Sequence, residues 1–211
     1  IEKNSFKPNF LGAIAIRAKI ESQEVSNFNT NNISLVMGSN AHLVLYPINL
    51  NKELNLICII RKKSEIIEDE KIILGKTILK ENKDLTNLFK KNLKSWFLYK
   101  SNKPIKSIYK NVFYVGDSFY TFPPTMAQGA SQAIESVYEI FNLIKDNPSN
   151  INDIYFKNRI ERTNLIIKRS KFNFFAFHIS NPVLKFFRNK ILRILIKNKN
   201  FINSYLGKVF K

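Results

Sequence analysis

The sequence predicts an α/β protein, which as a fragment takes an α+β layout: an antiparallel sheet, then one central parallel strand, then C-terminal helices. The first half holds four aliphatic and β-branched runs separated by turn residues. The second half holds segments whose apolar residues recur at helical spacing. Between them, Asn111–Val115 is apolar on both faces, as a strand covered on both sides would be. We expect three regions, 8–110, 111–147 and 148–211.

The antiparallel sheet is expected from four strands. Turn residues and Asn-rich loops separate the apolar runs, which predict strands at 10–20, 33–37, 42–48 and 54–61. The last two form an antiparallel pair around a short loop. Because side chains alternate along a strand, His42, Val44 and Tyr46 share one face. Pro47 cannot donate to a ladder, which indicates a strand end or an edge there.

The middle of the chain is less regular. Residues 62–71 are charged and are expected to be exposed, and 85–93 has the spacing of a short helix. A turn at Pro104 separates two apolar runs, 96–99 and 105–109. The strand Asn111–Val115 then has no βαβ partner in the chain, so we expect its neighbouring strands to lie upstream of Ile1.

Three helices are expected in the second half, at 127–144, 151–170 and 184–196. The first has an apolar stripe, which consists of Ala130, Ala133, Ile134, Val137, Ile140, Phe141 and Ile144. Asn147-Pro148 ends it, and Asn181-Pro182 precedes the third helix.

Charge is concentrated in the tail. The net charge is +18, and residues 157–211 carry 14 Lys or Arg against a single acid, Glu161. A compositional preference for lysine on solvated faces explains this, and so does an anionic membrane surface; nucleic acid has only bulk charge in its favour and is not expected as a partner. Within 181–197, Leu184, Phe187, Ile191, Ile194 and Leu195 form an apolar stripe beside Lys185, Arg188, Lys190 and Arg193. Such a stripe either packs on the core or lies on a membrane.

The location is expected to be the cytoplasm, with peripheral contact at the inner face of the membrane as an addition. Cys58 is the single cysteine and no signal-peptide pattern begins the chain. No run of 18 apolar residues predicts a transmembrane helix. His42 and His178 stand alone in the sequence, so no metal site is expected.

The stretch Val115–Ser136 organises the rest. It predicts a strand that ends at Gly116-Asp117, a crossing that contains Pro123 and Pro124, and a helix from Ala127. An acid at the end of a strand followed by a helix N-terminus is an arrangement that α/β proteins use for anionic or phosphorylated cofactors. A turn with a solvated Asp explains Gly116-Asp117 taken alone.

The motif resembles the second flavin motif of the class A FAD-dependent aromatic hydroxylases, the group of salicylate hydroxylase and 3-hydroxybenzoate 6-hydroxylase. The matching residues are Gly116, Asp117, Pro124, Ala127, Gln128, Gly129, Ala130, Ala133 and Glu135. Tyr120 stands where His is usual, and Ser136 where Asp is usual. Segments around 8–20, 38–48 and 159–178 are similar to the family as well. The resemblance implies the p-hydroxybenzoate-hydroxylase-like FAD/NAD(P)-binding fold, of which this chain looks like the C-terminal half to two thirds.

The resemblance also implies an activity. Such enzymes hydroxylate a small aromatic or related ring with NAD(P)H and O2 through a flavin C4a-hydroperoxide. The matching acid, Asp117, would bind the ribityl chain of FAD, Gln128 and Gly129 with their neighbours Ala127 and Ala130 the pyrimidine side of the ring, and Pro124 would lie near its reactive carbon. Because the first flavin motif, G-x-G-x-x-G, is not found here, the chain alone is expected to be inactive.

On the substrate side, His42 and Tyr46 share a strand face and resemble residues of the family's aromatic pocket. His42 is a candidate base for a phenol, with a structural role as the alternative. Tyr120 is a candidate cofactor or substrate contact, with a packed aromatic as the alternative. Other reactions on the same fold are a quinone-precursor hydroxylation, an epoxidation or a reduction; a non-catalytic, basic membrane-binding fragment is a further alternative. A homodimer is left open.

Overall fold

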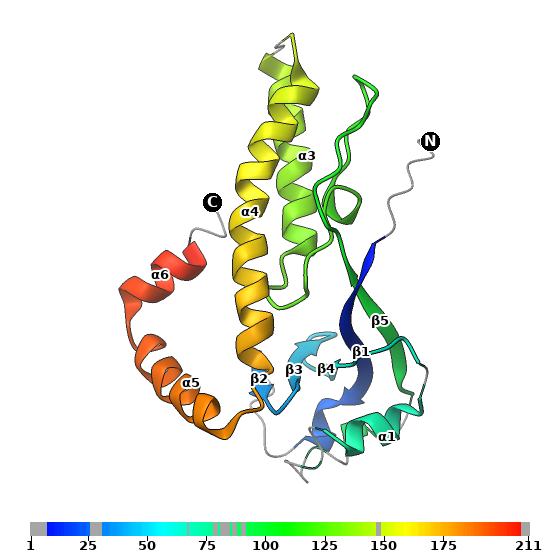
Figure 1. Ribbon diagram of the computed structural model, residues 1–211, viewed down its shortest axis with the longest axis vertical. Coiled ribbons are helices and arrows are strands. Elements are labelled where there is room, and N and C mark those ends of the chain that lie inside the picture. Colours follow the sequence, from blue (N-terminus) through cyan, green and yellow to red (C-terminus); the bar gives the residue numbers. More distant parts are fainter. Residues whose placement is uncertain are drawn as a thin grey trace. The chain divides into compact units, whose positions relative to one another are not determined.

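The computed structural model describes residues 8–25, 31–66, 68–77, 80, 85, 88–89, 92–146 and 149–207 (Figure 1). These residues fall into two units. The first contains Gly12–Leu98 and Phe175–Lys197, and the second contains the rest of the described chain. Each unit joins segments that are far apart in the sequence, whereas the regions 8–110, 111–147 and 148–211 follow chain order. That regional division stays a prediction.

The first unit is built on a five-stranded sheet with the order β2-β3-β4-β1-β5. Its strands are β1 (Asn9–Glu21), β2 (Ser34–Met37), β3 (Ala41–Ile48), β4 (Glu53–Arg61) and β5 (Lys94–Lys100). The pairs β2–β3, β3–β4 and β1–β4 are antiparallel, which confirms the predicted pair around the 49–53 loop. The first four strands agree with the predicted ranges to within one residue, and β5 includes the apolar run 96–99.

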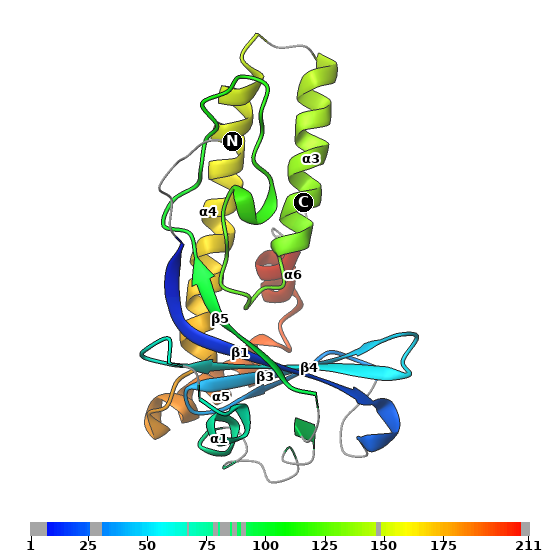
Figure 2. The same cartoon turned by 90° about the vertical axis from the view of Figure 1, so that its right-hand side faces the viewer.

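One face of this sheet forms the core of the first unit. It carries the even-numbered side chains of β1 and the partners that they meet on β3 and β4, such as Ile16, Leu43 and Cys58, all 0% exposed. The short helix α1 (Glu70–Gly75) packs its Ile73 and Leu74 into that core and lies below the sheet in Figure 2. Asp69 caps α1 by accepting from the amides of Lys71 and Ile72. This helix was not predicted, because 62–71 reads as a charged loop.

The second unit is mainly helical. Helix α3 (Gly129–Asp146) runs antiparallel to α4 (Ile151–Phe177), and α6 (Lys199–Gly207) follows (Figure 1). Helix α5 (Pro182–Leu195) belongs to the first unit. An aromatic cluster around Phe119, Tyr120 and Tyr155 forms the core of the second unit. The three predicted helices are confirmed, α4 extends seven residues beyond its predicted end at Ser170, and α6 was not predicted.

Two elements depart from expectation. Asn111–Val115 forms no strand in the described chain, because a strand needs a hydrogen-bonded neighbour and no described residue pairs with it. Helix α3 begins at Gly129 rather than Ala127, because Ala127 has a φ of 52°, in the left-handed region. The helix predicted over 85–93 lies partly outside the described residues; Leu85, Leu88 and Phe89 are buried there.

The apolar stripe of α3 is present, but nothing in the described chain covers most of it. Its exposed side chains are Ile134 (71%), Val137 (56%), Phe141 (62%) and Ile144 (56%). Tyr138, beside them, is 66% exposed. Periodicity therefore located the stripe correctly, and most of it is exposed within the described residues, whereas such a stripe ordinarily faces a core.

Candidate functional site

The turn at Gly116 brings the predicted motif together. Val115 is extended, Gly116 has a φ of 55°, and Gly116–Ser118 forms a single 3-10 turn. The carbonyl of Gly116 accepts from the amides of Phe119 and Tyr120, both at 3.0 Å. A β-carbon at Gly116 would lie only 3.0 Å from the β-carbon of Ala133 on α3. Glycine is therefore required twice here, for its left-handed backbone and for the close approach of the turn to α3.

Asp117 follows in this turn and lies at the start of α3. Its side chain is exposed, and its Oδ1 lies 4.0 Å from the point that a β-carbon on Gly129 would occupy. The first i to i−4 bond of α3 runs from the amide of Gln132 to the carbonyl of Gln128, at 2.9 Å. The amides of Gly129, Ala130 and Ser131 consequently have no acceptor inside the helix. An exposed carboxylate and a helix N-terminus thus meet at one place on the surface.

A buried polar network holds the first turn of α3 against α4. Gln132 is 1% exposed, and its Oε1 accepts from Arg159 at 2.6 Å. Arg159, 3% exposed, also lies 3.6 Å from carboxylate oxygens of Glu135 and Glu139. Arg162 donates to both carboxylate oxygens of Glu135, at 2.9 and 3.0 Å. Such a connected network of charged hydrogen bonds fixes the position of the helix start.

The predicted cofactor residues divide into an exposed set and a buried set. Pro124, Ala127, Gly129 and Ala130 are exposed, like Asp117. Gln128 differs: its side chain is 4% exposed, lies 3.4 Å from Gln132 Nε2, and faces away from solvent. The side chain of Gln128 therefore supports the helix, and a cofactor contact by Gln128 stays a prediction that falls to its backbone.

Tyr120 is also buried, at 3% exposure. Its ring lies 5.0 Å from that of Phe122 between centroids, within the aromatic cluster of the second unit. Burial raises the pKa of its phenol, so the hydroxyl stays protonated. This geometry favours the packed-aromatic alternative, and a cofactor or substrate contact by Tyr120 stays a prediction.

His42 and Tyr46 lie on the sheet face opposite to the core of the first unit. In β3–β4 pairing His42 is opposite Ile59, and Tyr46 is opposite Asn55. Since directly opposed residues of an antiparallel pair point to the same side, these four residues share a face, as predicted for His42 and Tyr46. Tyr46 is partly exposed, whereas His42 is 0% exposed.

The ring of His42 is enclosed by the end of α4. Its Nδ1 lies 3.1 Å from Nε2 of His178, which lies 3.3 Å from the carbonyl of Ile59, and the ring of Phe177 meets it edge to face. Burial first, and the neighbouring His178 second, lower the pKa of His42 to about 3. The imidazole is thus neutral at ordinary pH. Its enclosure favours the structural alternative, and the role of His42 as a base stays a prediction.

Arg17 and Asn55, which were not predicted as site residues, lie on this same face. The Arg17 Nε donates to Oδ1 of Asn55. Asn55 is 0% exposed, and its Nδ2 has no partner among the described residues. Asn55 is the cross-strand partner of Tyr46. Both residues interrupt apolar strands, and a polar residue on an otherwise apolar strand was the available signal.

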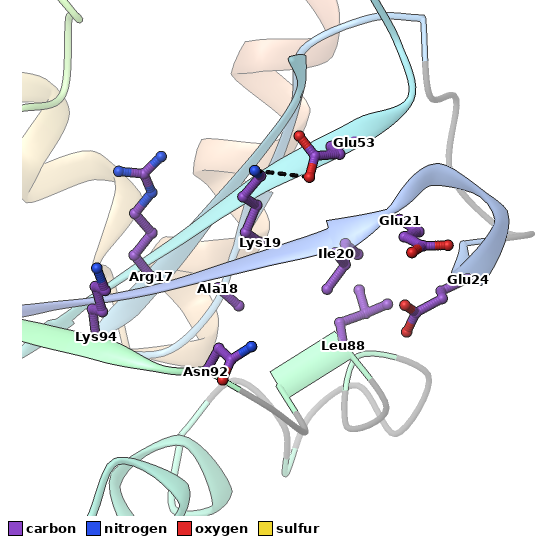
Figure 3. A pocket seen from close by; sticks show the side chains of 10 residues that line it. All are labelled: Arg17, Ala18, Lys19, Ile20, Glu21, Glu24, Glu53, Leu88, Asn92 and Lys94. Carbon is purple, nitrogen blue, oxygen red and sulfur yellow. Dashed lines mark ion pairs between the residues drawn. The ribbon is translucent and has the colours of Figure 1, made fainter. Parts of the chain in front are cut away.

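A pocket of about 830 Å³ lies along β1 in the first unit (Figure 3). Arg17, Lys19 and Lys94 line it together with the acids Glu21, Glu24 and Glu53, and Lys19 pairs with Glu53 at 2.7 Å. The mixed charges give it no preference for an anion or a cation. His42 and Tyr46 do not line it, so this pocket is not the predicted aromatic site. Among the described residues, no three His, Cys, Asp or Glu side chains gather as a metal site.

Several solved structures match the fold of this chain. Klebsiella pneumoniae HpxO, solved with FAD and uric acid, matches 97% of this chain with a TM-score of 0.75 and 12% identity. Salicylate hydroxylase, as a substrate complex, matches 98% with a TM-score of 0.74 and 16% identity, and CtdE, with FAD and a substrate, matches 92% with a TM-score of 0.66 and 11% identity. The chain has the fold of the FAD-dependent aromatic hydroxylases. This confirms the fold that the motif implied.

The hydroxylase fold is represented here only in part. The chain spans 54% of HpxO, 57% of salicylate hydroxylase and 60% of CtdE. No protein-family model matches the sequence, and no curated protein matches it. At such low identity the solved structures establish the fold alone.

Because position 116 requires glycine, adding one methyl group there should lower the stability of the fold. Gly116→Ala should lower the free energy of unfolding by about 2 kcal/mol, from left-handed backbone strain and the contact with Ala133. The matched control is Gly75→Ala at the end of α1, where nothing lies within 4 Å; it should be neutral or slightly stabilising. Urea unfolding of both variants measures this, and equal effects would refute the account of the turn.

The buried His42 predicts a pH-dependent stability. The folded pKa of His42, about 3, lies below its ordinary value of 6.5. The contribution of the neutral ring to the free energy of unfolding is therefore complete above pH 6.5 and is lost as the pH falls toward 3. In that window the unfolded state binds a proton that the folded state does not, which lowers the unfolding free energy by up to ~1.4 kcal/mol per pH unit. Urea unfolding at a series of pH values should show a shallower slope for His42→Phe than for the unchanged chain. Identical slopes would contradict the burial of a neutral ring.

Proposed function

We propose that this chain is the C-terminal part of an FAD-dependent monooxygenase that hydroxylates a small aromatic or related ring with NAD(P)H and O2. The observation that carries the proposal is the convergence of Asp117 with the free amides of Gly129 and Ala130 at the start of α3. Two of the solved structures that share the fold were determined with FAD, one also with uric acid and the other with a substrate.

The exposed residues fit the chemistry of a flavin. The Asp117 carboxylate accepts hydrogen bonds, as a hydroxylated ribityl chain requires. The amides at the start of α3, with the positive end of the helix dipole, suit the electron-rich pyrimidine edge of an isoalloxazine ring; one such contact contributes ~0.3 to 1 kcal/mol, more when partly buried. Gly129 leaves open the space that a side chain would fill. Bound FAD would supply the redox chemistry and the activation of O2.

The protein residues at this place bind and orient. The network of Gln132 and Arg159 holds α3, so that its amides are fixed before a ligand arrives. Ala127, with its φ of 52°, stores backbone strain immediately before the helix, as residues at ligand sites commonly do. Pro124 is exposed in the same crossing and limits its flexibility.

A ring-shaped substrate would bind on the sheet face that carries Arg17, Tyr46 and Asn55. Tyr46 offers a hydroxyl and an aromatic surface, and Arg17 and Asn55 offer donors beside it. The orphan Nδ2 of Asn55 is available to a substrate oxygen once the side chain is reached. The ring of His42 contacts His178, which in turn lies near the carbonyl of Ile59. The proposed role of His42 as a base requires its ring to become accessible. Epoxidation, quinone-precursor hydroxylation and reduction of an alkene use the same fold and remain the alternatives.

Removal of the Asp117 carboxylate should release the flavin. In the gene product that contains this chain, Asp117→Ala should reduce the bound FAD at least tenfold, since a hydrogen bond to a charged group contributes ~1.5 to 3 kcal/mol. Asp146→Ala removes an exposed carboxylate at the opposite end of α3 and should retain FAD. Flavin released by denaturation and quantified by absorbance is the readout. Equal FAD in both variants would remove Asp117 from the site.

The reaction class is tested by turnover. Phenols or small aromatic acids should accelerate NADH or NADPH oxidation by the flavin-loaded gene product. Tyr46→Phe should raise the KM of the responding compound about fivefold with little change in kcat, because it removes one hydrogen bond of ~1 kcal/mol. Tyr138→Phe, on the exposed face of α3, is the matched control. If no aromatic compound accelerates the oxidation, hydroxylation is excluded in favour of the other flavoprotein reactions.

A further inference from the structure

Helix α5, the orange helix in Figure 1, has its polarity reversed relative to an ordinary surface helix. The residues that it turns toward its own unit are Lys185, Arg188, Leu192 and Leu195, which recur at helical spacing and are buried or partly buried. Arg188 is 8% exposed, and its guanidinium donates to the carbonyl of Ala176 at 3.0 Å. Lys185 Nζ lies 3.3 Å from Oγ of Ser39. Two cations thus attach the helix to the first unit through hydrogen bonds.

The opposite side of α5 is apolar and faces solvent. Its exposed fractions are 61% for Val183, 50% for Leu184, 55% for Phe187, 53% for Ile191 and 69% for Ile194. At 100° per residue these side chains occupy one continuous arc of about 100°. We call them the apolar arc of α5. The stripe predicted from the sequence is therefore real, but it points outward, and Leu195 belongs to the inner side.

A row of cations borders the apolar arc on one side. Lys190, Arg193 and Lys197 are all exposed, and the Nζ of Lys190 lies 4.6 Å from the ring centroid of Phe186. No acidic residue occurs after Glu161 in the sequence, so no carboxylate of the tail neutralises this border. An exposed apolar arc beside lysine and arginine that form no ion pair among the described residues is the pattern of a helix that lies in a membrane interface.

We propose that α5 docks this chain on an anionic lipid surface, with the apolar arc at the boundary of the acyl chains and the basic border among the phosphates. The helix has 14 residues, roughly 21 Å at the α-helical rise, which suits a helix lying in the plane of the interface. In the described part of the chain no helix has both the length and the apolar composition needed to cross a bilayer. Basic residues close to an anionic leaflet each strengthen such binding.

Charge also decides against a second copy of α5 as the occupant. Two such helices packed antiparallel through their apolar arcs would bring the basic borders of both copies to the same side of the interface, with no carboxylate on either helix to separate them. Like charges in an interface are unfavourable. A surface rich in lipid phosphate meets both the apolar and the cationic side of the helix. This docking does not depend on the proposed flavin site.

The apolar arc is tested first. The purified chain should co-sediment with vesicles of phosphatidylcholine mixed with phosphatidylglycerol, and less with phosphatidylcholine alone. A variant with Phe187→Ser, Ile191→Ser and Ile194→Ser should lose co-sedimentation at least tenfold while its urea midpoint is unchanged, since all three side chains are already exposed. Absence of co-sedimentation of the unchanged chain would overturn the proposal. So would a dimer in sedimentation equilibrium that the triple variant converts to a monomer.

The basic border is tested with a matched charge change. Lys190→Glu with Arg193→Glu should weaken binding to the anionic vesicles at least tenfold, because each basic residue near such a surface changes the partition about fivefold. Lys157→Glu with Lys168→Glu makes the same charge change at exposed positions of α4 and should have a much smaller effect. Equal losses in both pairs would show that bulk charge binds the vesicles, which would overturn docking through α5.

Discussion

The left-handed turn at Gly116 is the constraint on which the candidate flavin site depends. It allows the chain to pass within contact distance of Ala133, and it thereby positions Asp117 beside the first turn of α3. The polar network of Gln132, Arg159 and the glutamates of α3 then holds that helix in place. Because a tight turn and a fixed helix start are both needed, the site is preorganised by backbone geometry rather than by its exposed side chains.

The exposed apolar surfaces of the two units differ in what surrounds them. The stripe of α3 contains Ile134 and Phe141 and has no described element over it. The apolar arc of α5 has a basic border instead and is attached to its unit by Arg188 and Lys185. The basic border therefore distinguishes α5, which suits an anionic lipid surface, from α3, whose exposed stripe has no such border. The chain spans 54% of HpxO and 57% of salicylate hydroxylase, so much of each of those structures has no counterpart here.

Sequence patterns located most of the architecture and part of the site. Alternation and helical spacing found four strands and three helices, and the motif around Gly116 and Asp117 led to the fold, because a glycine turn with an acid at fixed spacing constrains the backbone strongly. They left open what tertiary packing decides. The side chains of Gln128 and Tyr120 turned inward, and His42 is enclosed by Phe177 and His178, whose distance along the chain no local pattern conveys. A strand over Asn111–Val115 was likewise predicted from composition, which cannot supply the hydrogen-bonded neighbour that a strand requires.

We propose that the start of α3 and Asp117 together bind a flavin. Amide NMR of the isotopically labelled gene product, with FAD added stepwise, observes that place directly. If a flavin binds there, the amide signals of Gly129, Ala130 and Ser131 should shift together with that of Asp117, because those groups would contact the ligand. Saturating FAD that leaves these four signals in place, or that shifts only signals elsewhere in the chain, would contradict it.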